Sequence, residues 1–211
     1  MKTILLMIIA VGFLAIHLKA QDVDNRSSFN FGVKAGGNYA NVYDERGDEF
    51  RADGKFGFVA GVFASIPLGN MFGLQPEILF SQKGFKATGS ILGTNYGLTR
   101  TKNFIDIPLF ITVKPIPQLT VLAGPQVSYL LRQKDDFRSD AGTIEIIEEF
   151  ENDNVRKNIL GAVAGIDVNV DPLVIGMRAG WDFYTNNGDG SGQTPRYKNA
   201  WVQATLGFRL L

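Results

Sequence analysis

From residue 29 onward, polar and apolar residues alternate along the chain, and this alternation constrains the fold more than any other feature. Eight segments carry the pattern, with side chains of one kind at every second position. They span residues 29–39, 56–68, 72–83, 104–114, 119–132, 160–169, 173–184 and 201–210. A period of two residues is typical of β-strands, because successive side chains of a strand point to opposite faces of the sheet.

The connections between these segments alternate in length. Residues 42–53, 86–100, 133–154 and 185–197 form long connections, whereas residues 69–70, 115–118 and 171–172 form short ones. Membrane-spanning barrels have short turns at one end and long loops at the other, and their strands need about 9 to 11 residues to span. The sequence therefore predicts an all-β fold, an eight-stranded antiparallel up-and-down transmembrane β-barrel, with both termini in the periplasm and the long loops at the cell surface.

One face of each predicted strand is apolar and the other is mixed. Segment 104–114 shows this most clearly, because Ile105, Ile107 and Leu109 alternate with Asp106 and other mixed-face residues. In a membrane barrel the apolar face contacts lipid and the mixed face lines the lumen. Most strand glycines of this chain, which has 24 glycines in all, fall on the mixed face, where they make room for longer side chains.

The mixed faces together place charges of both signs inside the predicted lumen. An eight-stranded barrel is only just wide enough for side chains to fill it. We therefore predict a network of paired charges that plugs the lumen, while an ion path or proton relay is the alternative. The predicted network consists of Lys34, Glu77, Lys83, Asp106, Lys114, Arg132, Asp167, Arg178, Asp182 and Arg209.

Catalysis and metal binding find little support in the residue types present. The one histidine, His17, lies in the leader described below, and the chain has no cysteine. Nucleophilic systems that need His or Cys, and zinc sites built from them, are therefore not expected. A carboxylate pair such as Glu77 with Asp106 is conceivable, but salt-bridged lumen residues are the favoured interpretation. We predict no catalytic residues, no metal site, no cofactor and no enzymatic activity.

The N-terminal residues have the pattern of a secretory signal peptide. Lys2 is followed by an apolar run over residues 4–16, which is short for a spanning helix. We predict a signal over residues 1–20, a short periplasmic segment over 21–28 and the barrel over 29–211. A membrane anchor is the alternative to a cleaved signal.

The 21 basic and 21 acidic residues balance, so nucleic acid is not expected as a partner.

Two predicted loops have unusual compositions. Region 133–154 is rich in Asp and Glu, which could attract divalent cations or a basic partner, although a solvated surface loop is favoured. Residues 143–147 within it could extend a hairpin above the membrane. Residues 187–192 superficially resemble a calcium loop, but Lys198 stands where its closing Glu would fall, so a hairpin tip is favoured.

Several stretches of the chain resemble the outer membrane β-barrel domain family, the porin-family barrels of Bacteroidota that are related to PorT-type barrels. The resemblance covers the chain after the leader and is carried by residues 31–39 (FGVKAGGNY), 74–84 (LQPEILFSQKG), 105–109 (IDIPL), 122–125 (LAGP) and 206–210 (LGFRL). It implies an eight-stranded barrel in the outer-membrane lipid, inserted by the outer-membrane assembly machinery, with no catalytic residues to transfer.

Three functional hypotheses remain open from the sequence. The first is a non-enzymatic outer-membrane protein with a structural, surface-interaction or assembly-accessory role, in which the loops contact an extracellular partner. The second is a narrow channel for ions or small solutes. The third is a secreted soluble barrel that binds a lipid, but such a protein should have an apolar lumen, and here the predicted lumen is charged.

Overall fold

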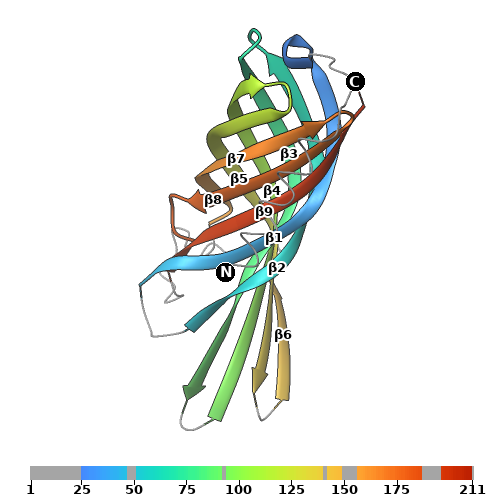
Figure 1. The fold of residues 1–211 in the computed structure, drawn as a ribbon. Coiled ribbons are helices and arrows are strands. Elements are labelled where there is room, and N and C mark those ends of the chain that lie inside the picture. Colours follow the sequence, from blue (N-terminus) through green and yellow to red (C-terminus); the bar gives the residue numbers. More distant parts are fainter. Residues whose placement is uncertain are drawn as a thin grey trace, which may run out of the picture.

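A computed structural model describes residues 25–46, 51–91, 94–139, 142–148, 156–186 and 196–210. The strands pair side by side around a closed cylinder (Figure 1). All strand pairings are antiparallel. A short 3-10 helix, η1 (Asn25–Ser27), precedes the first strand. The strands are β1 (Asn30–Arg46), β2 (Arg51–Pro67), β3 (Phe72–Ile91), β4 (Thr94–Ile116), β5 (Leu119–Ser139), β6 (Gly142–Glu148), β7 (Asn158–Val170), β8 (Leu173–Asp182) and β9 (Arg196–Arg209).

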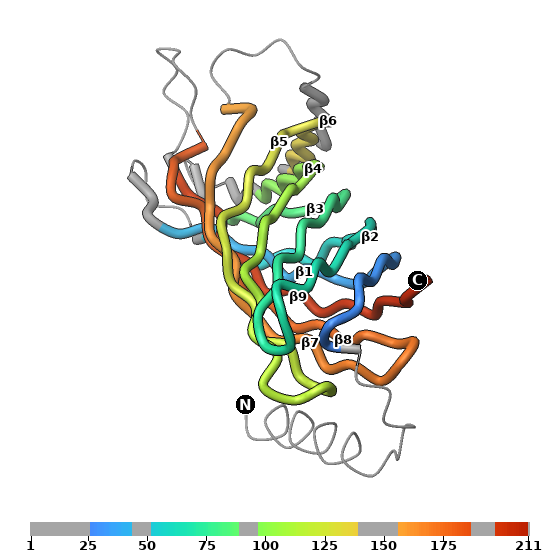
Figure 2. The backbone as a smooth tube through the Cα atoms, turned by 90° about the horizontal axis from the view of Figure 1, so that it is seen from above, coloured from blue at the N-terminus to red at the C-terminus, as the bar shows by residue number. Residues whose placement is uncertain are grey.

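Eight of these strands form the barrel, which confirms the predicted fold class. β9 lies beside β1 and closes the cylinder, with Lys34 opposite Gly207 in the register (Figure 2). β5 pairs with β4 on one side and with β7 on the other. The predicted signal peptide lies outside the described residues. No helix in the described part of the chain is long and apolar enough to cross a membrane.

Side chains alternate between the outside and the inside of the barrel as the sequence predicts. On β4, Ile107 and Ile111 are 48% and 63% exposed, whereas Phe104 and Phe110 are 0% exposed. β8 alternates between exposed and buried residues along its whole length. The barrel therefore turns its apolar side chains outward and its mixed face inward, which is the arrangement that a lipid surround favours.

The three short turns lie at the upper end of Figure 1, where η1 and the described end of β9 also lie. In the β2–β3 turn, Gly69 adopts a φ of +132°, a conformation that only glycine adopts without strain. A second glycine is required inside the barrel. A Cβ at Gly180 would overlap the indole ring of Trp201, so the lumen position of this tryptophan depends on the glycine beside it.

The predicted long loops are wrong in one respect, because strands continue far into them. β3 and β4 pair up to Ile91 and Thr94, across most of predicted connection 86–100. Beyond Tyr129, towards the end of β5, the partner of β5 changes from β7 to β6, which pairs with residues 133–139. The predicted hairpin extension over residues 143–147 is thus confirmed as part of β6. Together the ends of β3, β4 and β5 and the strand β6 form a sheet that projects beyond the barrel, called the projecting sheet below (Figure 1).

Candidate functional site

The lumen holds a buried ion network that joins four strands. Arg178 on β8 donates to Glu77 on β3 (Nη1 to Oε2, 2.6 Å) and to Asp167 on β7 (Nη2 to Oδ2, 3.2 Å). Lys34 on β1 donates to the second oxygen of Glu77 at 2.7 Å. Gln75 donates to both Glu77 and Asp167. All five side chains are buried, so each charge has its partners within the protein.

A second group of buried charges involves β3, β4, β8 and β9, and it shares β3 and β8 with the first network. Lys83 on β3 forms an ion pair with Asp106 on β4 at 2.9 Å, and Ser81 donates to the same carboxylate at 2.5 Å. Asp182 on β8 accepts a hydrogen bond from the side chain of Asn199 on β9. The sequence predicts Lys83, Asp106 and Asp182 on the inward face, and the structure buries all three.

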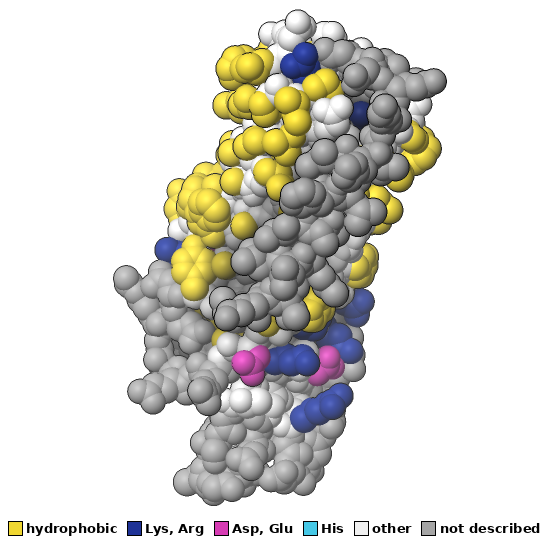
Figure 3. Space-filling view, viewed as in Figure 1, with side chains coloured by type: hydrophobic (Ala, Val, Ile, Leu, Met, Phe, Trp, Pro, Cys, Tyr) yellow, Lys and Arg dark blue, Asp and Glu magenta, His cyan; other side chains and the backbone are white. Residues whose placement is uncertain are grey.

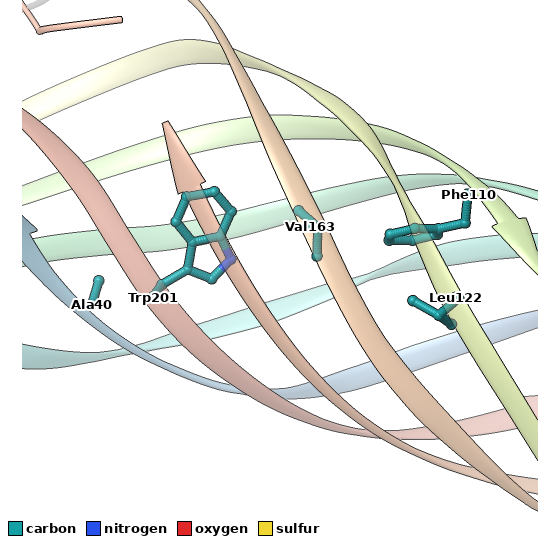
Figure 4. Packing of buried hydrophobic residues seen from close by; sticks show 5 residues of the cluster. All are labelled: Ala40, Phe110, Leu122, Val163 and Trp201. Atoms are coloured by element: carbon teal, nitrogen blue, oxygen red, sulfur yellow. The ribbon is translucent and has the colours of Figure 1, made fainter. Parts of the chain in front are cut away.

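Aromatic rings pack against the lumen cations. Lys34 lies 4.7 Å from the ring centroid of Phe63, Arg178 lies 5.0 Å from that of Phe110, and Lys83 lies 3.7 Å from that of Trp201. A cation over a ring face is attracted by the electrons of the ring. Phe110 and Trp201 also belong to a buried apolar cluster that Ala40, Leu122 and Val163 complete (Figure 4). The ion pairs and the aromatic rings together fill the lumen around Lys34, Lys83 and Arg178.

Two other predicted lumen residues lie near the turn end of the barrel. Lys114 is buried and donates to Ser65 at 3.1 Å. Arg209 is partly buried and donates to Asp171 in the β7–β8 turn and to Asn169. The contacts of both residues with Ser65, Asn169 and Asp171 thus lie at the turn end of the barrel.

The prediction for Arg132 is wrong, because this side chain is exposed on the outer face. The register of β4 and β5 shifts between Asn103 and Phe104, so that Leu131 is an extra residue in β5. Such a bulge moves the following side chains to the other face of the sheet. Gln133 therefore takes the inward position and is 4% exposed.

Sequence reasoning missed a cluster at the mouth of the barrel, which joins the projecting sheet to β9. Arg100 forms a two-point ion pair with Asp135 (Nε to Oδ1, 2.8 Å; Nη2 to Oδ2, 2.6 Å) and donates from Nη1 to the hydroxyl of Tyr197 at 3.2 Å. The Lys102 ammonium group lies 5.0 Å from the Tyr197 ring centroid. These residues were assigned to loops or strand margins, although Phe85 and Ala87 alternate with exposed Lys86 and Thr88 and could have revealed the strand.

The contacts of the two lumen carboxylates Glu77 and Asp106 favour a structural role for them over a role in acid–base chemistry. Glu77 is held by Lys34 and Arg178, while Asp106 is held by Lys83 and Ser81. The two carboxylates that the sequence left as a conceivable pair are thus bound to different cations. Among the described residues, no group of three His, Cys, Asp or Glu side chains is placed to hold a metal ion. The acidic residues at 149–153 and the glycine-rich run at 187–192 lie outside the described residues.

Several solved structures are similar to this chain. Ail, the attachment invasion locus protein of Yersinia pestis, is 13% identical over 85% of this chain and 99% of its own, with a TM-score of 0.45. Neisserial surface protein A is 11% identical over 84% of this chain and 96% of its own, with a TM-score of 0.47. OprG from Pseudomonas aeruginosa is 12% identical over 90% of this chain and 99% of its own, with a TM-score of 0.42. No curated protein matches the chain.

The family comparison covers most of the barrel. The profile described as "Outer membrane protein beta-barrel domain" matches residues 19–188, and the outward apolar face and closed antiparallel sheet are those of a membrane barrel. The chain belongs to the outer membrane protein β-barrel domain family.

Proposed function

We propose that this outer-membrane barrel is a non-enzymatic, non-conducting protein that acts at the cell surface through its projecting sheet. The observation that carries the proposal is the filled lumen. Lys34, Lys83 and Arg178 are each buried, paired with a carboxylate and packed on an aromatic ring. Opening a path would break ion pairs in a medium where an unpaired charge is costly.

The projecting sheet supports a surface role. β3, β4 and β5 run on beyond the point at which β7 leaves β5, and β6 adds a further strand there. The mouth cluster of Arg100, Asp135 and Tyr197 ties this sheet to β9 with side-chain hydrogen bonds. A sheet held in this way is a rigid platform for a structural, adhesive or assembly-accessory contact, with the short turns and both termini on the periplasmic side.

Conductance separates this proposal from the channel hypothesis. The protein is refolded into lipid vesicles, checked for heat-modifiable gel mobility and then measured in planar bilayers. We expect a folded barrel without steady single-channel currents. As the matched positive control, the variant Phe110→Ala/Arg178→Ala/Trp201→Ala removes three of the side chains that fill the lumen, and we expect it to conduct if it folds. Steady currents from the unaltered protein would overturn the proposal.

One observation favours the narrow channel as the second candidate. Three buried polar atoms, Arg178 Nε, Gln203 Nε2 and Asn38 Oδ1, have no hydrogen-bond partner in the protein, and they sit on register neighbours of β8, β9 and β1. Buried polar groups of this kind are satisfied by water. Water bound at these three atoms would form a row along the lumen face, from which a water or ion path could be built. The same conductance experiment decides between the two functions.

The orientation has its own test, because the chain contains no cysteine. Single substitutions Thr88→Cys and Arg138→Cys lie in the projecting sheet, and the matched controls Asn70→Cys and Gln118→Cys lie in the short turns. We expect a membrane-impermeant maleimide to label the first pair on intact cells and the second pair only after lysis. The reverse pattern would place the projecting sheet in the periplasm and overturn a cell-surface role.

A further inference from the structure

A groove crosses the outward face of the barrel wall, along which Figure 3 shows hydrophobic side chains. It has a volume of about 550 Å³, is open to the surroundings of the barrel and runs over β1, β9, β8 and β7. The outward residues of its floor are small, and they are Gly37, Ala204, Ala179 and Ala164. Ligand sites in proteins have volumes of about 300–1,000 Å³, so the groove has the size of a binding site.

The strand register explains why the four small residues form a continuous floor. Gly37 on β1 lies opposite Ala204 on β9, and Ala179 on β8 lies opposite Ala164 on β7. Val202, the next outward residue of β9, lies opposite Ala179, so the two pairs occupy adjacent rows. Neighbouring strands are about 4.8 Å apart, so a floor over four strands extends for about 14 Å.

Longer side chains border this floor. Tyr39, two residues along β1 from Gly37, forms an aromatic pair with Phe56 on β2, and the ring centroids are 4.8 Å apart. Met177 is exposed on β8 and lies opposite Ala204 in the register. The difference in length between the side chains of the floor and those of its borders creates the groove.

Gly37 keeps the groove open although packing within the protein does not require a glycine there. Leaving aside its chain neighbours, a Cβ at this position would have one described heavy atom within 4 Å, the carbonyl oxygen of Gly57 at 3.7 Å. At the adjacent Gly36, in contrast, a Cβ would overlap the backbone of Ala204. The outward position of the two therefore has room for a side chain that this sequence does not supply.

The groove lies within the apolar band of the barrel. The outward residues of β9 are apolar on both sides of Ala204, with Leu206 and Phe208 toward the turns and Val202 toward the mouth. The first charged outward residue toward the mouth is Lys198, six positions or about 20 Å along the strand from Ala204. Lumen side chains that border the floor are buried, and the lining is almost wholly apolar.

We propose that the groove binds one acyl chain of a membrane lipid. The outward face of a membrane barrel contacts lipid tails, and the groove is continuous with that face. A chain in the groove gains van der Waals contacts from the floor and from both borders, whereas a chain on a flat part of the wall touches one surface. The proposal needs only a barrel in its membrane and is independent of the surface role proposed above.

A second copy of the chain fits the groove poorly. Most homodimers have two-fold symmetry, so the same surface patch of each copy faces its counterpart. Two facing grooves would enclose a space that no side chain fills, and apolar surfaces in lipid associate through close packing. A thin and flexible hydrocarbon chain fills the groove without any change in the barrel.

Photolabelling tests the proposal. The protein is placed in phosphatidylcholine nanodiscs with a trace of phosphatidylcholine that carries a diazirine in the middle of one acyl chain. Illumination links this chain to the side chains that it touches, and peptide mapping by mass spectrometry locates the links. The groove variant, Ala179→Leu/Ala204→Leu, fills the floor with longer side chains. The matched control, Ala60→Leu/Ala64→Leu, adds the same two leucines to the outward face of β2, outside the groove.

We expect the segments around Tyr39 and Met177 to be labelled roughly tenfold more than the outward residues Ile107 and Ile111 of β4, since the groove adds about ten close contacts to a bound chain. The groove variant should lose this excess, while the control should keep it within about twofold, as for other surface substitutions. Even labelling around the unaltered barrel would overturn the proposal. An excess that persists in the groove variant would do the same.

Native mass spectrometry of the same nanodiscs distinguishes a lipid from a protein occupant. We expect the unaltered protein to retain phosphatidylcholine and the groove variant to retain less. A dimer that is present in the unaltered protein and lost in the groove variant, without an excess of photolabel, would overturn the proposal in favour of a second copy.

Two further checks separate a filled groove from a failed barrel. Heat-modifiable mobility shows whether each variant is folded. If the groove variant does not fold, Gly37→Leu replaces it and fills the groove from β1, where a Cβ has room. Conductance and maleimide labelling test the function proposed above, and their outcomes do not depend on the photolabel.

Discussion

Arg178 and Glu77 are 101 residues apart in the chain and form a buried ion pair of 2.6 Å inside the barrel. The two residues lie on β8 and β3, so the ion pair joins strands that are not neighbours in the sheet. It can form only after the sheet has closed, because β3 and β8 are brought to the same lumen by the pairing of β1 with β9. The ion pair is therefore a marker of the closed barrel.

Replacing Arg178 with Met should destabilise the barrel by about 3–5 kcal/mol, because Glu77 and Asp167 would lose their shared cation while remaining buried. Arg178→Lys should cost less, because an ammonium group retains the charge but not the planar fork that reaches both carboxylates. Urea unfolding in lipid vesicles measures both changes. The exposed Arg132→Met is the control and should change stability by less than about 0.5 kcal/mol. A loss from Arg178→Met no larger than that of the control would contradict a buried ion network.

The two tryptophans should respond differently to lipid. Trp181 is 42% exposed on the outer face, whereas Trp201 is 3% exposed inside the lumen. Brominated phospholipids quench the fluorescence of side chains that touch their tails. We expect strong quenching of the Trp201→Phe variant, in which Trp181 is the remaining emitter, and weak quenching of Trp181→Phe. Equal quenching of the two variants would show that the assignment of faces on β8 and β9 is wrong.

The alternation of residues was enough to predict the closed barrel and most of its lumen, because lipid on one side and crowding on the other select different residues. Lys34, Glu77 and Arg178 were placed correctly for this reason. Arg132 was misplaced because a bulge adds one residue to β5, and the pattern on either side of a bulge looks regular.

The projecting sheet was largely missed for a different physical reason. Beyond the lipid, the outer face of a strand has no need of apolar residues, so Lys86 and Thr88 resemble loop residues even though they lie on β3. The mouth cluster went unrecognised with the sheet, because Arg100, Asp135 and Tyr197 come from three segments that only the folded barrel brings together. Alternation indicates faces, but it does not indicate which side chains meet across the lumen.

A side chain added at Gly180 should disturb the packing of Trp201. Its Cβ would overlap the indole ring, and a ring that shifts would also leave Lys83, which lies 3.7 Å from its centroid. We expect Gly180→Ala to cost about 1–3 kcal/mol, the usual range for overpacking, and to shift the Trp201 emission in a Trp181→Phe background. Gly97→Ala is the matched control, since no atom lies within 4 Å of a Cβ at that position. If both alanine variants behave alike, the lumen is looser than the structure shows.

The mouth cluster should control how firmly the projecting sheet is held. Arg100 donates two hydrogen bonds to Asp135 within the projecting sheet and one to Tyr197 on β9, while the Tyr197 ring packs edge-on against Phe85 with centroids 5.0 Å apart. Tyr197→Phe removes only the hydroxyl, so the ring packing stays while the contact from Arg100 is lost. Hydrogen bonds to charged groups contribute about 1.5–3 kcal/mol. Backbone amides of β4 and β5 within the projecting sheet should therefore exchange roughly tenfold faster in the variant. Amides of the β4–β5 pairing near Ile111 and Ala123 should keep their rates, because the barrel below the mouth is unchanged. Uniform acceleration across both regions would mean that Tyr197 stabilises the barrel as a whole rather than the attachment of the projecting sheet.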